Sequence, residues 1–218
     1  MGLHDLSQEA SIAHHFIAEL RDTSIQQDPM RFRYNLARLG EVLAYEISKT
    51  LAYQAVTVPT VLGKASVQQL PQLPILLTVL RAGLPFFEGF QRIFDRSECG
   101  FVGAYRAHQA GDEEAFTIDL GYRAAPSLAG KDVILIDPML ATGQSLLAAM
   151  ETLADFGTPT HWHIAAAIAA PEGIERLQQE IKAPFTLWVG AVDDHLNNKA
   201  YIVPGLGDAG DLAYGSKQ

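Results

Sequence analysis

The sequence has little cysteine, an excess of negative charge and no long hydrophobic run. Cys99 is the only cysteine among 218 residues, which excludes an intramolecular disulfide and a cysteine-rich metal site. Lys and Arg total 16 against 25 Asp and Glu, so the chain lacks the basic surface that nucleic acids and anionic membranes require. The first residues lack the basic start and apolar run of a secretory signal. These absences predict a cytoplasmic protein with no nucleic-acid partner and no membrane partner.

The length and the hydrophobic content of 48% favour one α/β domain over residues 1–218. Apolar residues at helical spacing predict N-terminal helices over about 7–53, with a break at Asp28-Pro29. The core, about 56–190, contains six short apolar runs that read as strands, with helical stretches between several of them. These runs are Val56 to Val61, Pro74 to Leu80, Gly100 to Tyr105, Val133 to Ile136, Trp162 to Ala169 and Phe185 to Val189.

This alternation predicts a mostly parallel sheet flanked by helices. The polar segment from Ala107 to Gly130 is expected to form a hairpin or flap. A last segment, about 193–215, is dense in Gly, Asp, Asn and Pro and has little periodicity. Such a long irregular segment in a compact domain is more often functional than idle.

The sharpest local signal is the stretch VILIDPMLATGQSLLAAMETL, residues 133–153. A buried strand ends at Asp137, a loop of small residues follows, and an amphipathic helix begins near Ser145. Ligands of open α/β sheets bind beyond the carboxyl ends of strands, and free N–H groups at a helix start attract phosphate. Gly143 would let the backbone approach a phosphate, with the Thr142 and Ser145 hydroxyls as further donors. The alternative for so short a pattern is an ordinary turn with Ser145 as the helix cap.

Four blocks resemble the signatures of uracil phosphoribosyltransferases, in the family's order. DPMLATGQS, residues 137–145, resembles the family's loop DPMLATGGS for phosphoribosyl pyrophosphate (PRPP), with Gln144 in place of a glycine. The others are LRAGLPFFEG at 80–89, VGAYR at 102–106 and AYIVPGLGDAGDLAYG at 200–215, where Ala200 replaces a usual glycine. The middle segment departs most, since Asp119 stands where a lysine is expected.

The resemblance implies a type I phosphoribosyltransferase-like core with a small base-binding hood and a flap. The implied reaction joins uracil to PRPP, giving UMP and pyrophosphate, with Asp137, Arg106 and Asp208 as catalytic residues. Uracil would bind to the backbone of four residues in the tail, Ile202, Gly207, Asp208 and Ala209. The implied PRPP-binding residues are Arg81, Arg106, Asp137, Pro138, Met139, Leu140, Ala141, Thr142, Gly143, Gln144, Ser145 and Asp208.

The resemblance also implies Mg2+ as cofactor, held mainly by PRPP and not by a protein metal site. It leaves GTP as a candidate effector and a homodimer or homotetramer as the expected assembly. The alternative function is a regulatory paralogue that binds PRPP or UMP with little catalysis. Asp193 and Asp194 either cap the tail loop or accept substrate contacts. His161 and His163 alternate along a predicted strand and could suggest a metal pair, but with two candidate ligands and no partners nearby we expect two unrelated side chains on one sheet face.

Overall fold

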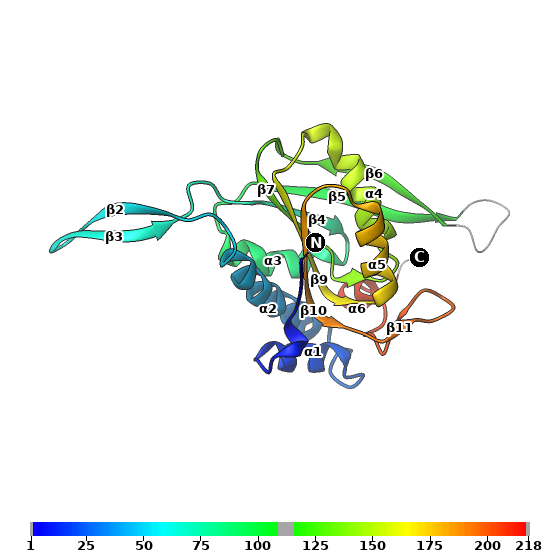
Figure 1. The fold of residues 1–218 in the computed structure, drawn as a ribbon. Helices are drawn as coiled ribbons and strands as arrows, with labels where there is room; N and C mark the ends of the chain where they lie inside the picture. The colour runs from blue at the N-terminus through cyan, green and yellow to red at the C-terminus, as the bar shows by residue number, and fades with distance from the viewer. Residues whose placement is uncertain (1, 109–115, 217–218) are drawn as a thin grey trace.

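A central, mostly parallel sheet forms the middle layer of the computed structural model, which describes residues 2–108 and 116–216 (Figure 1). All neighbouring strands of the main path are parallel except β5 and β6, which form an antiparallel hairpin. A two-residue strand, β8 (Met139–Leu140), also pairs with β9. The strand order is β1 (Gly2–Asp5), β10 (Phe185–Val192), β9 (His161–Ala169), β7 (Asp132–Ile136), β4 (Ile75–Leu80), β5 (Cys99–His108) and β6 (Phe116–Ala124).

Helices cover both faces of the sheet, and the expected fold class is confirmed. Side chains alternate along the strands: Leu77 and Leu135 pack toward one face, Leu76 and Ile134 toward the other. One face packs against η1 (Leu6–Gln8), α1 (Ala13–Arg21), α2 (Pro29–Ser48) and α3 (Gly83–Ile93). The other face packs against α4 (Gln144–Leu153), η2 (Ala154–Phe156) and α5 (Pro171–Glu180).

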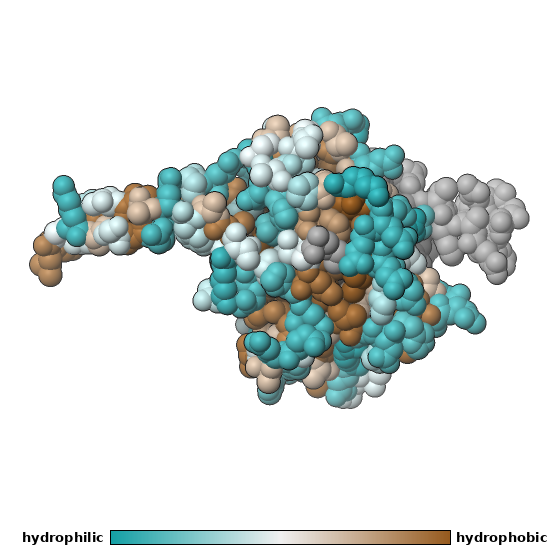
Figure 2. Space-filling view, viewed as in Figure 1, coloured by the Kyte–Doolittle hydropathy of each residue, from teal (hydrophilic) through white to brown (hydrophobic). Residues whose placement is uncertain are grey.

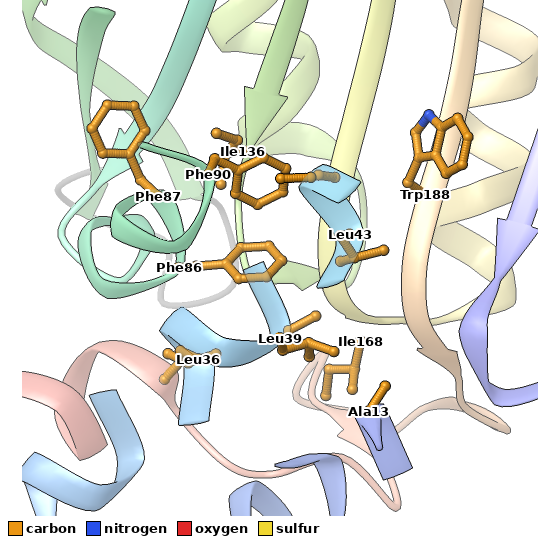
Figure 3. Packing of buried hydrophobic residues seen from close by; sticks show 14 of the residues in the cluster. Ala13, Leu36, Leu39, Leu43, Phe86, Phe87, Phe90, Ile136, Ile168 and Trp188 are labelled. Atoms are coloured by element: carbon orange, nitrogen blue, oxygen red, sulfur yellow. The ribbon is translucent and has the colours of Figure 1, made fainter. Parts of the chain in front are cut away.

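The larger core lies between α2, α3 and the sheet. Phe86 and Phe90 of α3 meet edge to face with their ring centroids 5.3 Å apart. Figure 3 shows them beside Leu39 and Leu43 of α2. A side chain at Gly89 would put its Cβ only 2.0 Å from the Ala37 carbonyl oxygen, so this glycine lets the two helices touch. The close contact at Gly89 holds α3 against α2, and both helices share this core with the sheet.

The predicted break between the first two helices is confirmed. The Asp28 carboxylate accepts hydrogen bonds from the N–H groups of Met30 and Arg31, 2.9 and 3.2 Å away, and Pro29 occupies the first helical position. This is the usual chemistry of a helix start.

Two elements differ from the sequence prediction. Residues 2–5 form strand β1 at the edge of the sheet beside β10, ahead of the helices predicted from about residue 7. The run from Val56 is a strand as predicted, β2 (Gln54–Thr60), but it pairs only with β3 (Gly63–Gln69). Figure 1 shows this hairpin, which we call the arm, extending away from the body of the molecule. Alternating polar and apolar residues predict a strand without indicating its partner.

The expected hairpin between Ala107 and Gly130 is confirmed as β5 and β6, whereas residues 109–115 lie outside the described part of the chain. The tail is more ordered than its composition suggests. It contains the antiparallel pair β11 (His195–Leu196) and β12 (Ile202–Val203), followed by α6 (Ala209–Tyr214).

Candidate functional site

The order in which the chain adds strands to the sheet reverses between β4 and β7. From β4 the chain continues through α3 on one face to β5, and from β7 it continues through α4 on the other face to β9. The loops after the two strands therefore diverge and leave a crevice at their carboxyl ends. Ligands of open α/β sheets bind in such crevices.

A pocket of about 500 Å³ fills this crevice. Its wall combines three segments that are far apart in the sequence: the turn after β4, the loop after β7 and the tail. The lining residues are Val79, Leu80, Arg81, Ala82, Asp137, Met139, Ala141, Thr142, Gly143, Gln144, Ser145, Leu146, Ala200, Tyr201, Ile202, Gly207, Asp208, Ala209 and Gly210. Most of the residues that the sequence singled out thus lie around one cavity.

The loop after β7 leads directly into α4. Gly143 precedes the helix with a φ of 75°, the left-handed conformation that favours glycine. Helix α4 begins at Gln144, so Ser145 lies inside the first turn and is not the cap that the simpler alternative required. The first N–H groups of a helix have no intrahelical acceptor and can bind an anion. Gln144 is not among the residues with positive φ, so the backbone here does not demand the family's glycine.

Two residues of this loop hold the backbone and do not line the pocket. Pro138 and Leu140 are buried. The Pro138 carbonyl accepts from the N–H groups of Ala167 and Ile168, at 3.0 and 3.1 Å, and the Leu140 carbonyl accepts from Ala170 N–H at 2.9 Å. The loop is therefore fastened along β9 by its backbone, which leaves its small side chains facing the cavity.

Asp137 is the most perturbed acid of the pocket. It follows β7 directly and is 9% exposed. Burial raises the pKa of its carboxyl to about 7, and the Met139 N–H, 3.3 Å from Oδ1, lowers it only partly. Burial disfavours the charged form of an acid, and hydrogen-bond donors restore it. The site thus holds a carboxyl that a ligand with several O–H donors would ionise.

Arg81 lies in the turn after β4, where the peptide bond from Leu80 is cis. Its exposed guanidinium faces the tail: Nη2 is 3.6 Å from Asp211 Oδ1 and 3.4 Å from the Gly215 carbonyl oxygen. A Cβ at Gly210 would come within 3.9 Å of the same Nη2. The arginine turn and α6, which both line the pocket, therefore lie next to each other.

The tail closes the remaining side of the pocket. Asp208 is exposed and begins α6, where its Oδ1 accepts from Asp211 N–H at 2.9 Å. The Ile202 side chain is buried in the larger core, which fixes the backbone of β12 beside the cavity. Asp193, for which two roles were open, holds the tail: its Oδ2 accepts from Gly205 N–H at 2.8 Å.

Some sequence candidates fall elsewhere. Arg106 belongs to β5, opposite Ile118, but its side chain lies outside the described part of the structure. His161 and His163 lie on one face of β9 as predicted, with different partners: His161 contacts Thr186 Oγ1 and His163 accepts from Trp188 Nε1.

Sequence reasoning missed several pocket residues, chiefly Leu80, Ala82, Tyr201 and Gly210. All lie inside the quoted blocks and next to residues that it did select, so including the neighbours of each selected residue would have found them. It also missed Arg21 of α1, which donates to Asp193 and to the Gly205 carbonyl oxygen. No local pattern marks that arginine.

Comparison with known proteins gives consistent results. The family model described as uracil phosphoribosyltransferase matches residues 7–216. A protein of Porphyromonas gingivalis named uracil phosphoribosyltransferase is 45% identical over 212 residues, covering 97% of both chains. One of Pyrococcus furiosus with the same name is 37% identical over 202 residues, covering 91% of this chain and 84% of the other. A solved structure from Aquifex aeolicus superposes with a TM-score of 0.86 at 34% identity, covering 98% of both chains.

Proposed function

Because the chain belongs to the uracil phosphoribosyltransferase family, we propose that its pocket joins uracil to the ribose of PRPP. The bond from the ribose C1 to pyrophosphate breaks, a bond from C1 to uracil N1 forms, and the N1 proton is released. The products are UMP and pyrophosphate. The observation that carries this proposal is the pocket itself, in which an anion-binding loop, an arginine turn and a backbone-rich tail meet.

The loop from Thr142 to Ser145 is the proposed site of the 5′-phosphate of PRPP. The hydroxyls of Thr142 and Ser145, with the N–H groups at the start of α4, supply donors on one side of the cavity. The positive end of the α4 dipole points at the same place and favours an anion. Met139, Ala141 and Gln144 also line this part of the pocket.

Asp137 is the proposed partner of the ribose hydroxyls. A carboxylate placed against phosphate would repel it, whereas it accepts hydrogen bonds from two neighbouring hydroxyls. Burial raises the pKa of Asp137 to about 7. The O–H donors of the ribose would stabilise the ionised form of this carboxyl when PRPP binds. The negative charge would then lie near the ribose as positive charge develops at C1.

Arg81 is the proposed partner of the pyrophosphate. A guanidinium stays charged and can contact two phosphate oxygens at once. Its contacts with Asp211 and Gly215 are long, 3.6 and 3.4 Å, so a pyrophosphate oxygen could replace them at little cost. Arg106, which the resemblance also assigns to pyrophosphate, remains part of the proposal.

The tail is the proposed uracil site. Uracil presents two carbonyl oxygens flanking an N–H, a pattern that backbone N–H and C=O groups can match. The backbone of Ile202, Gly207 and Ala209 lies along the pocket, and Asp208, which lines the same pocket, is the proposed contact for both substrates. Cytosine has a different order of donors and acceptors, and unpaired buried groups can cost about 10⁴-fold in specificity.

Mg2+ is the proposed cofactor, and the pocket suits it. Magnesium is usually bound by one or two carboxylates together with substrate phosphates. We expect PRPP to hold most of the Mg2+ coordination, with the exposed carboxylate of Asp208 as the protein group that would assist it. The described residues contain no cluster of three or more acidic, His or Cys ligands. Bound Mg2+ would supply charge stabilisation for the leaving pyrophosphate.

A direct assay tests the function. UMP formation from uracil and PRPP with Mg2+ should be rapid, with cytosine, hypoxanthine and orotate as competing bases that react poorly. Asp137→Asn should lower kcat/KM for PRPP by about 100-fold, since an oriented charged group is lost. If PRPP or UMP bound while no base reacted, the regulatory alternative would replace the enzyme.

We further propose that the chain forms homo-oligomers through the arm. Val61 and Leu62 at its tip are 100% and 98% exposed, and Figure 2 shows this apolar end far from the body. An isolated two-stranded hairpin is marginally stable in water, so an arm of this kind gains from a partner surface.

GTP remains a candidate effector, to be tested by adding it to the assay. The lone cysteine supports a cytoplasmic location.

No helix in residues 2–108 or 116–216 is long and apolar enough to cross a membrane.

A further inference from the structure

Arg21 and Asp193 form a charged pair beneath the proposed uracil site. Asp193 follows β10, its side chain is 3% exposed, and its own N–H donates to the Ala169 carbonyl at the end of β9. Arg21 is the last residue of α1. Its Nη1 lies 2.9 Å from Asp193 Oδ2, and its Nη2 contacts Oδ1. This two-pronged contact fixes both the distance and the orientation of the carboxylate.

The pair holds one residue of the tail by its backbone. Asp193 Oδ2 accepts from Gly205 N–H at 2.8 Å, and Arg21 Nη1 lies 3.2 Å from the Gly205 carbonyl oxygen. Both polar backbone groups of Gly205 are thus engaged. Gly205 has a φ of 64°, and a Cβ there would lie 2.1 Å from the Ile202 carbonyl oxygen, so the chain turns tightly at this point.

Gly205 lies in the middle of the segment 202–209, which lines the pocket at four of its eight positions. Backbone groups can discriminate between bases only when their directions are fixed before the base arrives. We infer that Arg21 and Asp193 are positioning residues, which fix the backbone of segment 202–209 and thereby set the affinity and selectivity for the base. This inference rests on the proposed function and adds α1, an element outside the phosphoribosyltransferase signatures, to the base site.

A charged pair suits this role better than a neutral one. The buried Asp193 carboxylate accepts from Gly205 N–H and from Arg21, and the arginine compensates its charge. Neither residue lines the main pocket, so neither should contact substrate. Loosening the pair should therefore affect uracil more than PRPP.

Arg21→Lys is the most informative variant. Lysine keeps the positive charge that the buried carboxylate needs, but its single ammonium cannot reproduce the fork that spans Asp193 and Gly205 O. Arg31→Lys is the matched control, because Arg31 also holds a carboxylate through two N–H groups, that of Glu19, and ties α1 to α2 without touching the tail. Asp193→Asn, which keeps an acceptor for Gly205 N–H, is the second variant.

The experiment measures steady-state kinetics and amide hydrogen exchange of the full chain. In Arg21→Lys we expect the KM for uracil to rise about tenfold, the KM for PRPP to rise by less because Asp208 is the only residue of this segment that is proposed to contact PRPP, and the preference for uracil over cytosine to fall. Exchange in segment 202–209 should accelerate, whereas Arg31→Lys should leave both readouts unchanged.

A uracil KM that is the same in Arg21→Lys and Arg31→Lys would overturn the inference. Failure of the proposed function looks different, because the wild-type chain would then make no UMP at all. In that case unchanged exchange in Arg21→Lys and Asp193→Asn would still refute the positioning role, and faster exchange would support the anchoring of segment 202–209.

Discussion

Ala200 lines the pocket with a φ of 58°, a conformation in which an L side chain crowds the following carbonyl. It is the position at which the family pattern has glycine. Ala200→Gly should raise the free energy of unfolding by about 0.5–1 kcal/mol, because the strain relieved exceeds the extra chain entropy of glycine. Urea denaturation measures this. Ala148→Gly, in the regular helix α4, is the control and should instead lower it by about 1 kcal/mol.

The residues of the site differ in how far the sequence could reveal them. Asp137, Thr142 and Gly143 are consecutive or nearly so, and a strand-loop-helix pattern surrounds them, so local reading was enough. Arg21 acts on Gly205, 184 residues away, and only the packed fold brings the two together. A sequence has no periodicity that encodes such a contact.

Helix α5 packs behind the loop that follows β7. A Cβ at Gly173, in the first turn of α5, would lie 2.2 Å from the Ala141 carbonyl oxygen and 3.1 Å from Leu140 Cδ1. Gly173→Ala must therefore push the loop toward the pocket or move the helix away. We expect it to raise the KM for PRPP about tenfold or more, with a smaller effect on the KM for uracil.

The control for this change is Glu175→Ala, at an exposed position of the same helix. It should leave both Michaelis constants within about twofold. A Gly173→Ala variant with normal PRPP kinetics would show that α5 does not determine the shape of the loop.

At the scale of elements, the sequence predicted whether a segment is a helix or a strand better than it predicted which strands pair with one another. The strands at β4, β7, β9 and β10 were found because buried strands are apolar and lie between turn residues. Strand β1 was missed, since Gly2–Asp5 is short and contains His and Asp. The arm was read as part of the core because alternation along a strand does not tell whether the apolar face meets a sheet or a second molecule.

In the proposed homo-oligomer the arm is the contact between subunits. Val56 pairs with Val67 and Val58 with Ala65, which gathers the apolar residues of the arm on one face. Replacing Val61 and Leu62 together by serine removes the apolar tip and should shift the protein toward a smaller species in sedimentation velocity. Thr57→Ala, on the polar face opposite Ser66, should sediment like wild type. Equal sedimentation of all three proteins would exclude the arm as the contact.

Two buried groups on different parts of the sheet give the whole molecule opposing responses to pH. Burial raises the pKa of Asp137 from 3.8 to about 7, so the folded protein binds this proton more tightly and stability falls as the pH rises between about 4 and 7. Burial, with smaller effects of His161 and His4, lowers the pKa of His163 from 6.5 to about 4. The unfolded chain then binds that proton more tightly, and stability rises with pH between about 4 and 6.5.

In wild type the two slopes should largely cancel between pH 4.5 and 6, because each can reach about 1.4 kcal/mol per pH unit with opposite sign. In the Asp137→Asn variant only His163 of these two groups still titrates. The free energy of unfolding of this variant should therefore rise across this pH range by about 1–2 kcal/mol relative to wild type. His163→Gln, which keeps an acceptor for the Trp188 N–H, should fall by a similar amount. Urea denaturation at several pH values compares the three proteins, whose other titrating groups are the same. Parallel stability curves would mean that neither burial shifts the proton equilibrium as the structure indicates.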